Sequence, residues 1–277
     1  MDLIESLPTM VQAIIVVMVF SGLTVGGLYL VRSHVSAQRL KDDHDVAGFT
    51  FSVVGAFYGV ILAFVIVAVW QRFERANEKA QDESLALSNL YNLSWGFDEP
   101  ERGELRQALH TYTTKVLERE WKQMSEYNYR LNMEDENTLW QLLLKYAPAA
   151  GQQQIILDKS LDQMAALSDA RRLRYVYYSE DLPTVIWIVI YVGCVITLGF
   201  SYFFSTRLFR SQAIMCATFA ALIGLTILAI SELATPYQGA VVVSDEGFRF
   251  LLDSMNASHA SAAAHALVAA PIPPSSP

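Results

Sequence analysis

The segment HDVAGFTFSVVGAFYGVILAFVIVAVWQRF, residues 44–73, decides the fold of this chain. From Phe49 to Trp70 it contains no charged residue. A helix of roughly 20 apolar residues is long enough to cross the hydrocarbon core of a bilayer. The segment therefore predicts a transmembrane helix.

Three further apolar blocks occur along the chain. The predicted spans lie at about residues 11–31, 49–70, 184–205 and 213–233. Of the 277 residues, 53% are hydrophobic and 17% are charged, which is less charge than soluble domains usually carry. The leader MDLIESLPTM has two acids and no base, so the first block is interpreted as a retained span rather than a signal peptide. The expected fold is an all-α, polytopic membrane protein with four transmembrane helices.

The polar region between the second and third spans is expected to form a helical bundle outside the membrane. Its apolar residues recur at three- and four-residue steps, as in helices with one buried face. Helices are predicted at 134–146 and 152–178. Because no turn signal separates Trp70 from Leu93, the second span is expected to continue beyond the membrane as one helix.

The chain thus divides into five expected parts. They are a transmembrane hairpin at 1–70, a helical extramembrane region at 71–183, a second transmembrane hairpin at 184–233, a loop and short helix at 234–255, and a tail at 256–277. The tail is rich in Ala, Pro and Ser and poor in bulky apolar residues, so we expect it to be disordered.

The basic residues of the short loops indicate the orientation in the membrane. The loops after spans one and three carry Arg32, Arg39, Lys41, Arg207 and Arg210, whereas the leader has no Lys or Arg. Basic residues in short loops favour the cytoplasmic side, which places both termini and the helical region outside the cytoplasm. The basic residues of the long region favour the opposite orientation, but the rule is weak for long loops.

Small and bulky residues lie on opposite sides of the second span. The small side includes Gly48, Gly55 and Gly59, with Ser52 and Ala63. Small residues at four-residue spacing let two helices approach closely in lipid, and span one has the same feature at Gly22 and Gly26. We therefore expect spans one and two to pack through these glycine faces.

Two interpretations remain open for the bulky side, which carries Phe57, Ile61 and Phe64. In the simpler one, these side chains meet lipid or other spans, since apolar residues are the default in a span. In the other, several copies of the chain bring them together as an apolar constriction that gates by dewetting. The second interpretation requires a homo-oligomer.

Charged residues at the ends of the spans are candidate site residues. Glu232 lies within about a turn of the end of span four, on the same side as Arg72 and Arg75, which could neutralise it. Such a group is either a structural ion pair or a ring of charge at a pore mouth. His44 and Asp45 precede span two, where capping of the helix explains them better than a sensor or a cation site.

Other classes of function receive little support. No Walker loop, nucleophile elbow, zinc-protease motif or Cys/His cluster occurs, so neither an enzyme nor a bound metal or cofactor is expected. A net charge of −8 argues against nucleic-acid binding. Cys194 and Cys216 both fall within apolar blocks and are expected to be packing residues.

Four stretches of the sequence resemble the bestrophin-like domain family, a group of bacterial membrane proteins of unknown function. They are HDVAGFTFSVVGAFYGVILAFVIVAVW, DESLALSNLY, RRLRYVYYSEDLPTVIWIVI and ELATPYQGAVVVSDEGF, and the resemblance covers nearly all of residues 1–255. Bestrophins are pentameric anion channels with four spans and a helical region between spans two and three. The resemblance therefore implies that Phe57, Ile61 and Phe64 line an apolar neck. It also implies that the helical region lies in the cytosol, which is the opposite of the orientation that the charges of the short loops indicate. In this sequence no acidic cluster matches the bestrophin calcium clasp, so calcium gating is not expected.

The expected function is a homo-oligomeric ion channel of the bacterial inner membrane, favouring small anions, with span two as its pore helix. Its expected partners are the lipid bilayer, further copies of the chain and small inorganic ions. The alternative is a non-conducting envelope anchor or sensor whose helical bundle binds a protein partner.

Overall fold

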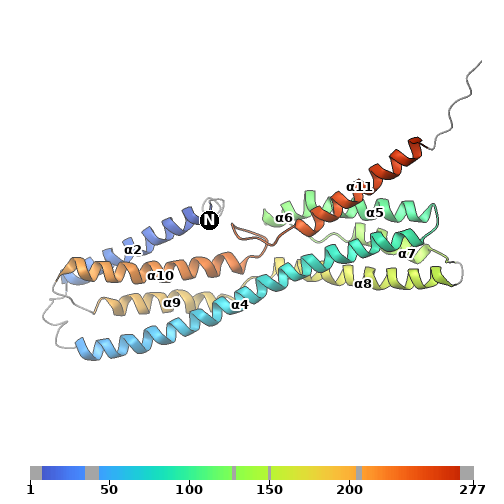
Figure 1. Cartoon of the computed structure of the whole chain (residues 1–277). Coiled ribbons are helices and arrows are strands. Elements are labelled where there is room, and N and C mark those ends of the chain that lie inside the picture. The colour runs from blue at the N-terminus through green and yellow to red at the C-terminus, as the bar shows by residue number, and fades with distance from the viewer. Residues whose placement is uncertain (1–7, 35–43, 127–128, 149–150, 204–207, 269–277) are drawn as a thin grey trace, which may run out of the picture. The chain divides into compact units, whose positions relative to one another are not determined.

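The computed structural model describes residues 8–34, 44–126, 129–148, 151–203 and 208–268 (Figure 1). Every regular element within these ranges is helical, which confirms the predicted all-α fold. The α-helices are α2 (Thr9–His34), α4 (His44–Leu93), α5 (Glu101–Lys115), α6 (Trp121–Ser125), α7 (Glu134–Lys145), α8 (Gln152–Ser179), α9 (Thr184–Ser201), α10 (Phe209–Ala234) and α11 (Glu246–Val268). A 3₁₀ turn, η1 (Ser94–Gly96), follows α4, and a π-helical turn, η2 (Val116–Glu120), joins α5 to α6.

Four helices are long and apolar enough to cross a membrane, and they correspond to the four predicted spans. They are α2, α9, α10 and the part of α4 that begins at Gly48. The α4 helix extends over 50 residues and ends at Leu93, so the prediction that span two continues as one helix is confirmed.

The chain forms two compact units. The first, which we call the membrane unit, comprises Met1–Arg75 and Ser179–Val242. The second, the extramembrane unit, comprises Ala76–Tyr178 and Val243–Pro277. The segment after Val242, which the sequence analysis treated as a separate part, belongs to the extramembrane unit.

In the membrane unit, α4, α9 and α10 share one hydrophobic core. Its buried members are Tyr58, Leu62, Val69, Ile190, Cys194, Ile223, Ile227, Ile230 and Ala234. The Tyr58 hydroxyl donates a hydrogen bond of 2.8 Å to the carbonyl oxygen of Ile190. The ring lies so close to Gly193 that a Cβ there would come within 2.4 Å of it, so only glycine allows α4 and α9 this approach.

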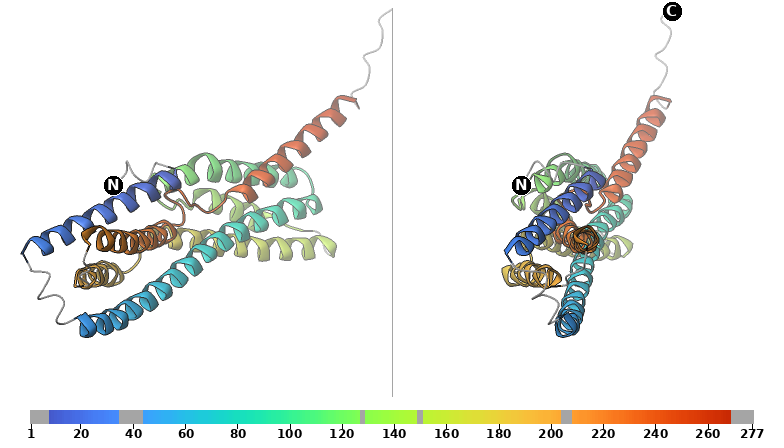
Figure 2. Two further views of the ribbon diagram at one scale, coloured as in Figure 1. Left: turned by 60° about the vertical axis from the view of Figure 1, so that its left-hand side comes forward. Right: turned by 90° about the vertical axis from the view of Figure 1, so that its left-hand side faces the viewer.

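The helix α2 packs against α10 (Figure 2). Gly224 of α10 accommodates Phe20 of α2, because a Cβ at position 224 would lie 2.8 Å from the Phe20 ring. The predicted packing of spans one and two through their glycine faces is wrong for the single chain. Within the described residues, no atom beyond the adjoining residues and the local helix backbone lies within 4 Å of a Cβ built at Gly22, Gly26, Gly55 or Gly59. Small residues mark a face that allows close approach, but they do not specify which helix makes it.

The end of α10 is tied to the loop that follows it. Glu232 is buried, and its Oε2 accepts hydrogen bonds from the backbone N–H groups of Ala240 at 2.9 Å and Val241 at 3.3 Å. The chain turns back at Gly239, whose φ of +85° favours glycine. A Cβ at Gly239 would also lie 2.9 Å from Glu232 Oε2. The carboxylate therefore anchors the loop at 235–241.

In the extramembrane unit, the predicted helices at 134–146 and 152–178 are confirmed as α7 and α8. The apolar faces of α4, α5, α7 and α8 are buried, and the largest fully buried apolar residues include Leu87, Leu90, Leu105, Leu109, Leu139 and Leu143. Helical spacing of apolar residues thus predicted the buried sides in part: Leu90, Leu105 and Leu109 are buried, whereas Leu85, which follows the same spacing, is 60% exposed.

A network of buried charges also lies in this unit. Arg174 of α8 donates from Nε to Glu83 Oε2 of α4 at 2.6 Å and from Nη2 to Glu120 Oε2 of η2 at 2.8 Å. Arg171 donates from Nη2 to Glu120 Oε1 at 2.6 Å. All four side chains are buried, with 0% to 10% exposure. The network therefore links three segments that are far apart in the sequence.

The two guanidinium groups control the ionisation of Glu120. Burial by itself raises the pKa of this carboxyl, but the positive charges of Arg174 and Arg171 and hydrogen bonds from Arg174 and Tyr129 outweigh it. The pKa of Glu120 is consequently lower than its ordinary value.

The segment expected to be disordered is partly helical. The α11 helix continues to Val268 and so includes the first part of the predicted tail at 256–277. Alanine has the highest helix propensity of the natural residues, and this Ala-rich segment extends a helix that is already anchored. Phe248 provides that anchor, because it is buried and packs against Trp121 with ring centroids 5.5 Å apart. Residues 269–277 lie outside the described ranges.

The substitution Glu120→Gln tests the buried network. We expect the free energy of unfolding to decrease by about 3 kcal/mol at neutral pH, which is the lower end of the cost of removing one partner of a buried ion pair. An unfolded Glu titrates near pH 4.3, roughly, so the contribution of Glu120 is complete above that pH and is lost as the pH falls through its lower folded pKa. The unfolding temperature measured in detergent should therefore fall less steeply between pH 7 and pH 3 in the variant than in the wild type. Glu118→Gln, at an exposed position of the same turn, is the control. Identical pH profiles for Glu120→Gln and the wild type would contradict this assignment.

The substitution Glu232→Ala tests the loop anchor. It removes the acceptor of two backbone hydrogen bonds, and bonds to a charged group contribute about 1.5–3 kcal/mol each. Amide hydrogen exchange at Ala240 and Val241 should accelerate by about tenfold or more, since 1.4 kcal/mol corresponds to a factor of 10. Glu232→Gln retains an acceptor oxygen and should have a smaller effect. Unchanged exchange in the alanine variant would show that the loop is held by other contacts.

Candidate functional site

The predicted neck residues lie on a side of α4 that the single chain does not bury. Phe57 is 69% exposed, Ile61 38% and Phe64 72%. The same helix buries Tyr58, Leu62 and Val69 in the core of the membrane unit. The bulky face is thus available to lipid or to another copy of the chain.

An apolar groove runs beside this face, between α4 and α9. Its volume is about 480 Å³, and Phe57 and Ile61 line it together with Val189, Val192 and Ile196 of α9. Polar groups contribute little to the lining, so the groove suits an apolar occupant such as a lipid chain or a helix of a neighbouring copy.

Gly48 lies at the start of the same helix and lines a second groove, of about 500 Å³. Phe51, Ser52, Met215 and Phe219 also line this groove, which lies between α4 and α10. Phe51 and Phe219 meet edge to face, with centroids 5.6 Å apart. Near Gly48, therefore, α4 meets α10 through Phe51 and Phe219.

The charged residues at the ends of the spans have different partners from those predicted. Glu232 binds the backbone of its own loop, as described above. Arg72 donates from Nη2 to the backbone carbonyl of Glu180, and its Nη1 lies 4.0 Å from Glu180 Oε2. Arg75 is exposed. The predicted pairing of Glu232 with Arg72 or Arg75 is wrong. The chain reverses at Gly239, and the backbone N–H groups that follow take the place of an arginine as partners of the carboxylate.

His44 and Asp45 form the first turn of α4. Their side chains lie outside the described residues, so the capping and cation-site interpretations stay predictions. Among the residues that the structure describes, no group of three or more His, Cys, Asp or Glu could hold a metal ion.

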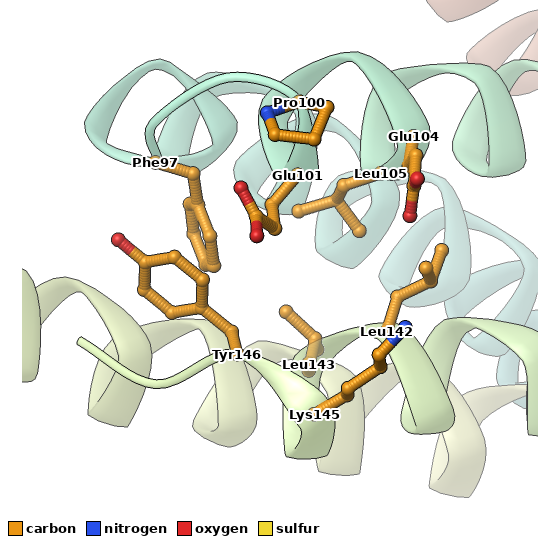
Figure 3. A pocket seen from close by; sticks show the side chains of 9 residues that line it. All are labelled: Phe97, Pro100, Glu101, Glu104, Leu105, Leu142, Leu143, Lys145 and Tyr146. Carbon is orange, nitrogen blue, oxygen red and sulfur yellow. The ribbon is translucent and has the colours of Figure 1, made fainter.

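The extramembrane unit has a cavity of about 160 Å³ between the start of α5 and the end of α7 (Figure 3). Leu105, Leu143 and the rings of Phe97 and Tyr146 form its apolar walls, and the two rings lie 4.6 Å apart. Glu101 and Glu104 of α5 and Lys145 of α7 border it. Acids in the first turn of a helix complement its dipole, so the cavity needs no ligand to explain its charges.

The buried network was not predicted from the sequence. The arginines of RRLRYVYY were considered only as topology charges, and Glu83 in DESLALSNLY received no role. The signal was nevertheless present, because Arg171 and Arg174 are spaced to share one face of a helix whose apolar residues predict burial. A buried guanidinium requires an acidic partner, but spacing along one helix cannot identify it.

Comparison with known proteins supports the resemblance noted in the sequence. A family model described as the bestrophin-like domain matches residues 18–248. A crystal structure of a bacterial bestrophin homologue from Klebsiella pneumoniae with a point mutation has a TM-score of 0.62 at 12% sequence identity and covers 88% of this chain and 98% of that chain. A crystal structure of a membrane protein has a TM-score of 0.60 at 12% identity, with 86% and 97% covered. No curated protein matches the chain.

At 12% identity, the likeness to the solved structures shows the fold alone. The family match extends over most of the chain and includes all four candidate spans at least in part. This chain is therefore a membrane protein of the bestrophin-like domain family.

Proposed function

We propose that the chain assembles into a homo-oligomeric channel for small inorganic ions, favouring anions, with α4 as the pore helix. Phe57, Ile61 and Phe64 form its apolar neck. The observation that carries the proposal is the exposure of this face: α4 packs through Tyr58, Leu62 and Val69 and leaves two phenylalanines outside the core. Membership of the bestrophin-like family supports it.

A ring of copies explains the exposed apolar surface as well as lipid does, and it adds a function. Around a common axis, the neck residues of several α4 helices form a constriction that water leaves readily, which closes the path to ions. The groove between α4 and α9 would then receive a helix of the neighbouring copy. The glycine face of α4, at Gly55 and Gly59, also has open space beside it in the single chain and allows close helix contact.

We place the channel in the bacterial cytoplasmic membrane with the extramembrane unit outside the cytoplasm, as the basic residues of the short loops indicate. Fusion of alkaline phosphatase and of green fluorescent protein to the C-terminus tests this orientation. Phosphatase activity without fluorescence is expected. The opposite result would place the extramembrane unit in the cytosol, as in bestrophins.

Native mass measurement of the detergent-solubilised protein tests the assembly. A closed ring of four or more copies is expected, and chloride and potassium flux in liposomes then tests conduction and selectivity. A monomer or dimer would remove the shared pore. The second candidate function, an envelope anchor whose bundle binds a protein partner, would then be favoured, because the extramembrane unit has its own core and ion network.

The substitutions Phe57→Ala and Phe64→Ala test the neck. Each removes a large apolar side chain and widens the constriction, so wetting becomes easier and chloride flux should increase several-fold. Val195→Ala, at a position 71% exposed on α9, removes apolar surface away from the proposed neck and serves as the control. Unchanged flux and selectivity in both phenylalanine variants would exclude this face as the neck.

A further inference from the structure

Glu83 is the most completely buried acid of α4, with 0% exposure. Its Oε2 accepts from Arg174 Nε at 2.6 Å, and its Oε1 accepts from Arg174 Nη2 at 3.1 Å and from the Tyr112 hydroxyl at 2.8 Å. One carboxylate on α4 is therefore held by a two-point contact from α8 and a third contact from α5. Such a geometry specifies orientation as well as distance.

The partners of Glu83 are themselves restrained. Arg174 also bonds Glu120, and Arg171 bonds Glu120 and the backbone carbonyl of Asn132 at 2.7 Å. Glu136 Oε2 lies 3.9 Å from Arg171 Nε and has no hydrogen-bond partner among the described residues. Three carboxylates thus share two guanidinium groups in this network.

Stability alone does not account for this arrangement. Well-packed apolar residues of similar volume are often as stabilising as a buried ion pair, or more so, because the charges lose their hydration. What a two-point ion pair can add is a unique geometry. Such a restraint matters most where apolar packing leaves the position of a segment poorly defined.

The part of α4 between Val69 and Leu87 is such a segment. Apart from Glu83, its buried side chains are small: Ala76, Ala80, Ser84 and Ala86. Ser84 in turn faces Gly247 of α11, where a Cβ would lie 2.6 Å from the Ser84 hydroxyl oxygen. Small side chains interdigitate little, so they allow close approach while resisting rotation or sliding only weakly. The contacts of Glu83 supply the missing restraint.

A rotation set at Glu83 can reach the membrane part of α4. The helix is continuous from His44 to Leu93, and from Val60 to Trp95 the sequence contains neither glycine nor proline. Sharp kinks are almost always found at such residues or at local breaks in the hydrogen-bond ladder. Phe64 and Glu83 thus belong to the same uninterrupted helix.

We propose that Glu83, held by Arg174 and Tyr112, is a positioning residue that sets the rotation of α4 and thereby regulates the opening of the channel. This inference rests on the proposed function, in which α4 lines the pore. The role is regulatory: releasing Glu83 changes how often the pore is open and leaves the permeation path itself intact.

The first experiment compares single-channel currents of the full-length protein in planar bilayers. Tyr112→Phe removes one bond to Glu83 and keeps the ring, and Glu83→Gln removes the charge. We expect open probability to change in the order wild type, Tyr112→Phe, Glu83→Gln, with about a fivefold or larger change in the last, the lower end of typical coupling between sites. Unitary conductance and anion selectivity should stay constant. Glu78→Gln, at an exposed acid of the same helix, is the control.

Equal open probability in all four proteins would overturn the inference while leaving the channel function in place. A change in conductance and selectivity together with open probability would also overturn it, because the substitutions would then alter the permeation path. Thermal unfolding of each variant identifies loss of fold, and Tyr112→Phe is the mild variant that keeps the test decisive.

A second experiment does not depend on conduction. Phe57→Cys and Phe64→Cys are introduced separately with Cys194→Ala and Cys216→Ala, and the rate of thiol modification in liposomes is measured with and without Glu83→Gln. A rotation of α4 should alter the two rates by different factors. If the wild type carries no current, the proposed function fails and the regulation of opening fails with it. The rates then still test whether Glu83 sets the rotation of α4, and equal rates with and without Glu83→Gln would overturn that part as well.

Discussion

A backbone that crosses a bilayer has to satisfy its hydrogen bonds within itself, because hydrocarbon offers no partner. The helices α2, α9, α10 and the first part of α4 meet this constraint, because the backbone of a helix forms its hydrogen bonds within the segment itself. The side chains are therefore free to specify packing. In this chain they do so through a few close approaches at glycines, among them Tyr58 against Gly193, Tyr202 against Gly27 and Phe20 against Gly224 in the membrane unit.

The buried side chains of α4 differ between the membrane unit and the extramembrane unit. In the membrane unit, apolar side chains such as Tyr58, Leu62 and Val69 form its buried face. In the extramembrane unit, it buries Leu87 and Leu90 and also a carboxylate, Glu83, which forms an ion pair with Arg174. Burying these charges removes their hydration. The loss is offset only because the carboxylates of Glu83 and Glu120 each meet a guanidinium group in good geometry. The lowered pKa of Glu120 expresses this compensation.

Glu232 illustrates how a buried charge can have a purely local explanation. A carboxylate near the end of a span is a reasonable candidate for ion conduction, because such groups are expensive in a membrane. Here two backbone N–H groups of the following loop satisfy it. A ring of charge at a pore mouth is therefore better sought at exposed positions such as Arg75 than at Glu232.

The sequence by itself determined the helical class, the four spans, the continuous α4 and the bounds of α7 and α8 nearly to the residue. These properties depend on local pattern: apolar runs of bilayer length, helical spacing and the absence of Gly and Pro over a long stretch. Only the tertiary structure decided which glycines are in contact, that Glu232 binds Ala240 and Val241, and that Glu83 meets Arg174. Each of these contacts depends on how the chain folds in space. The spacing of residues along one helix shows which face can make contacts, but it does not identify the group that this face will meet.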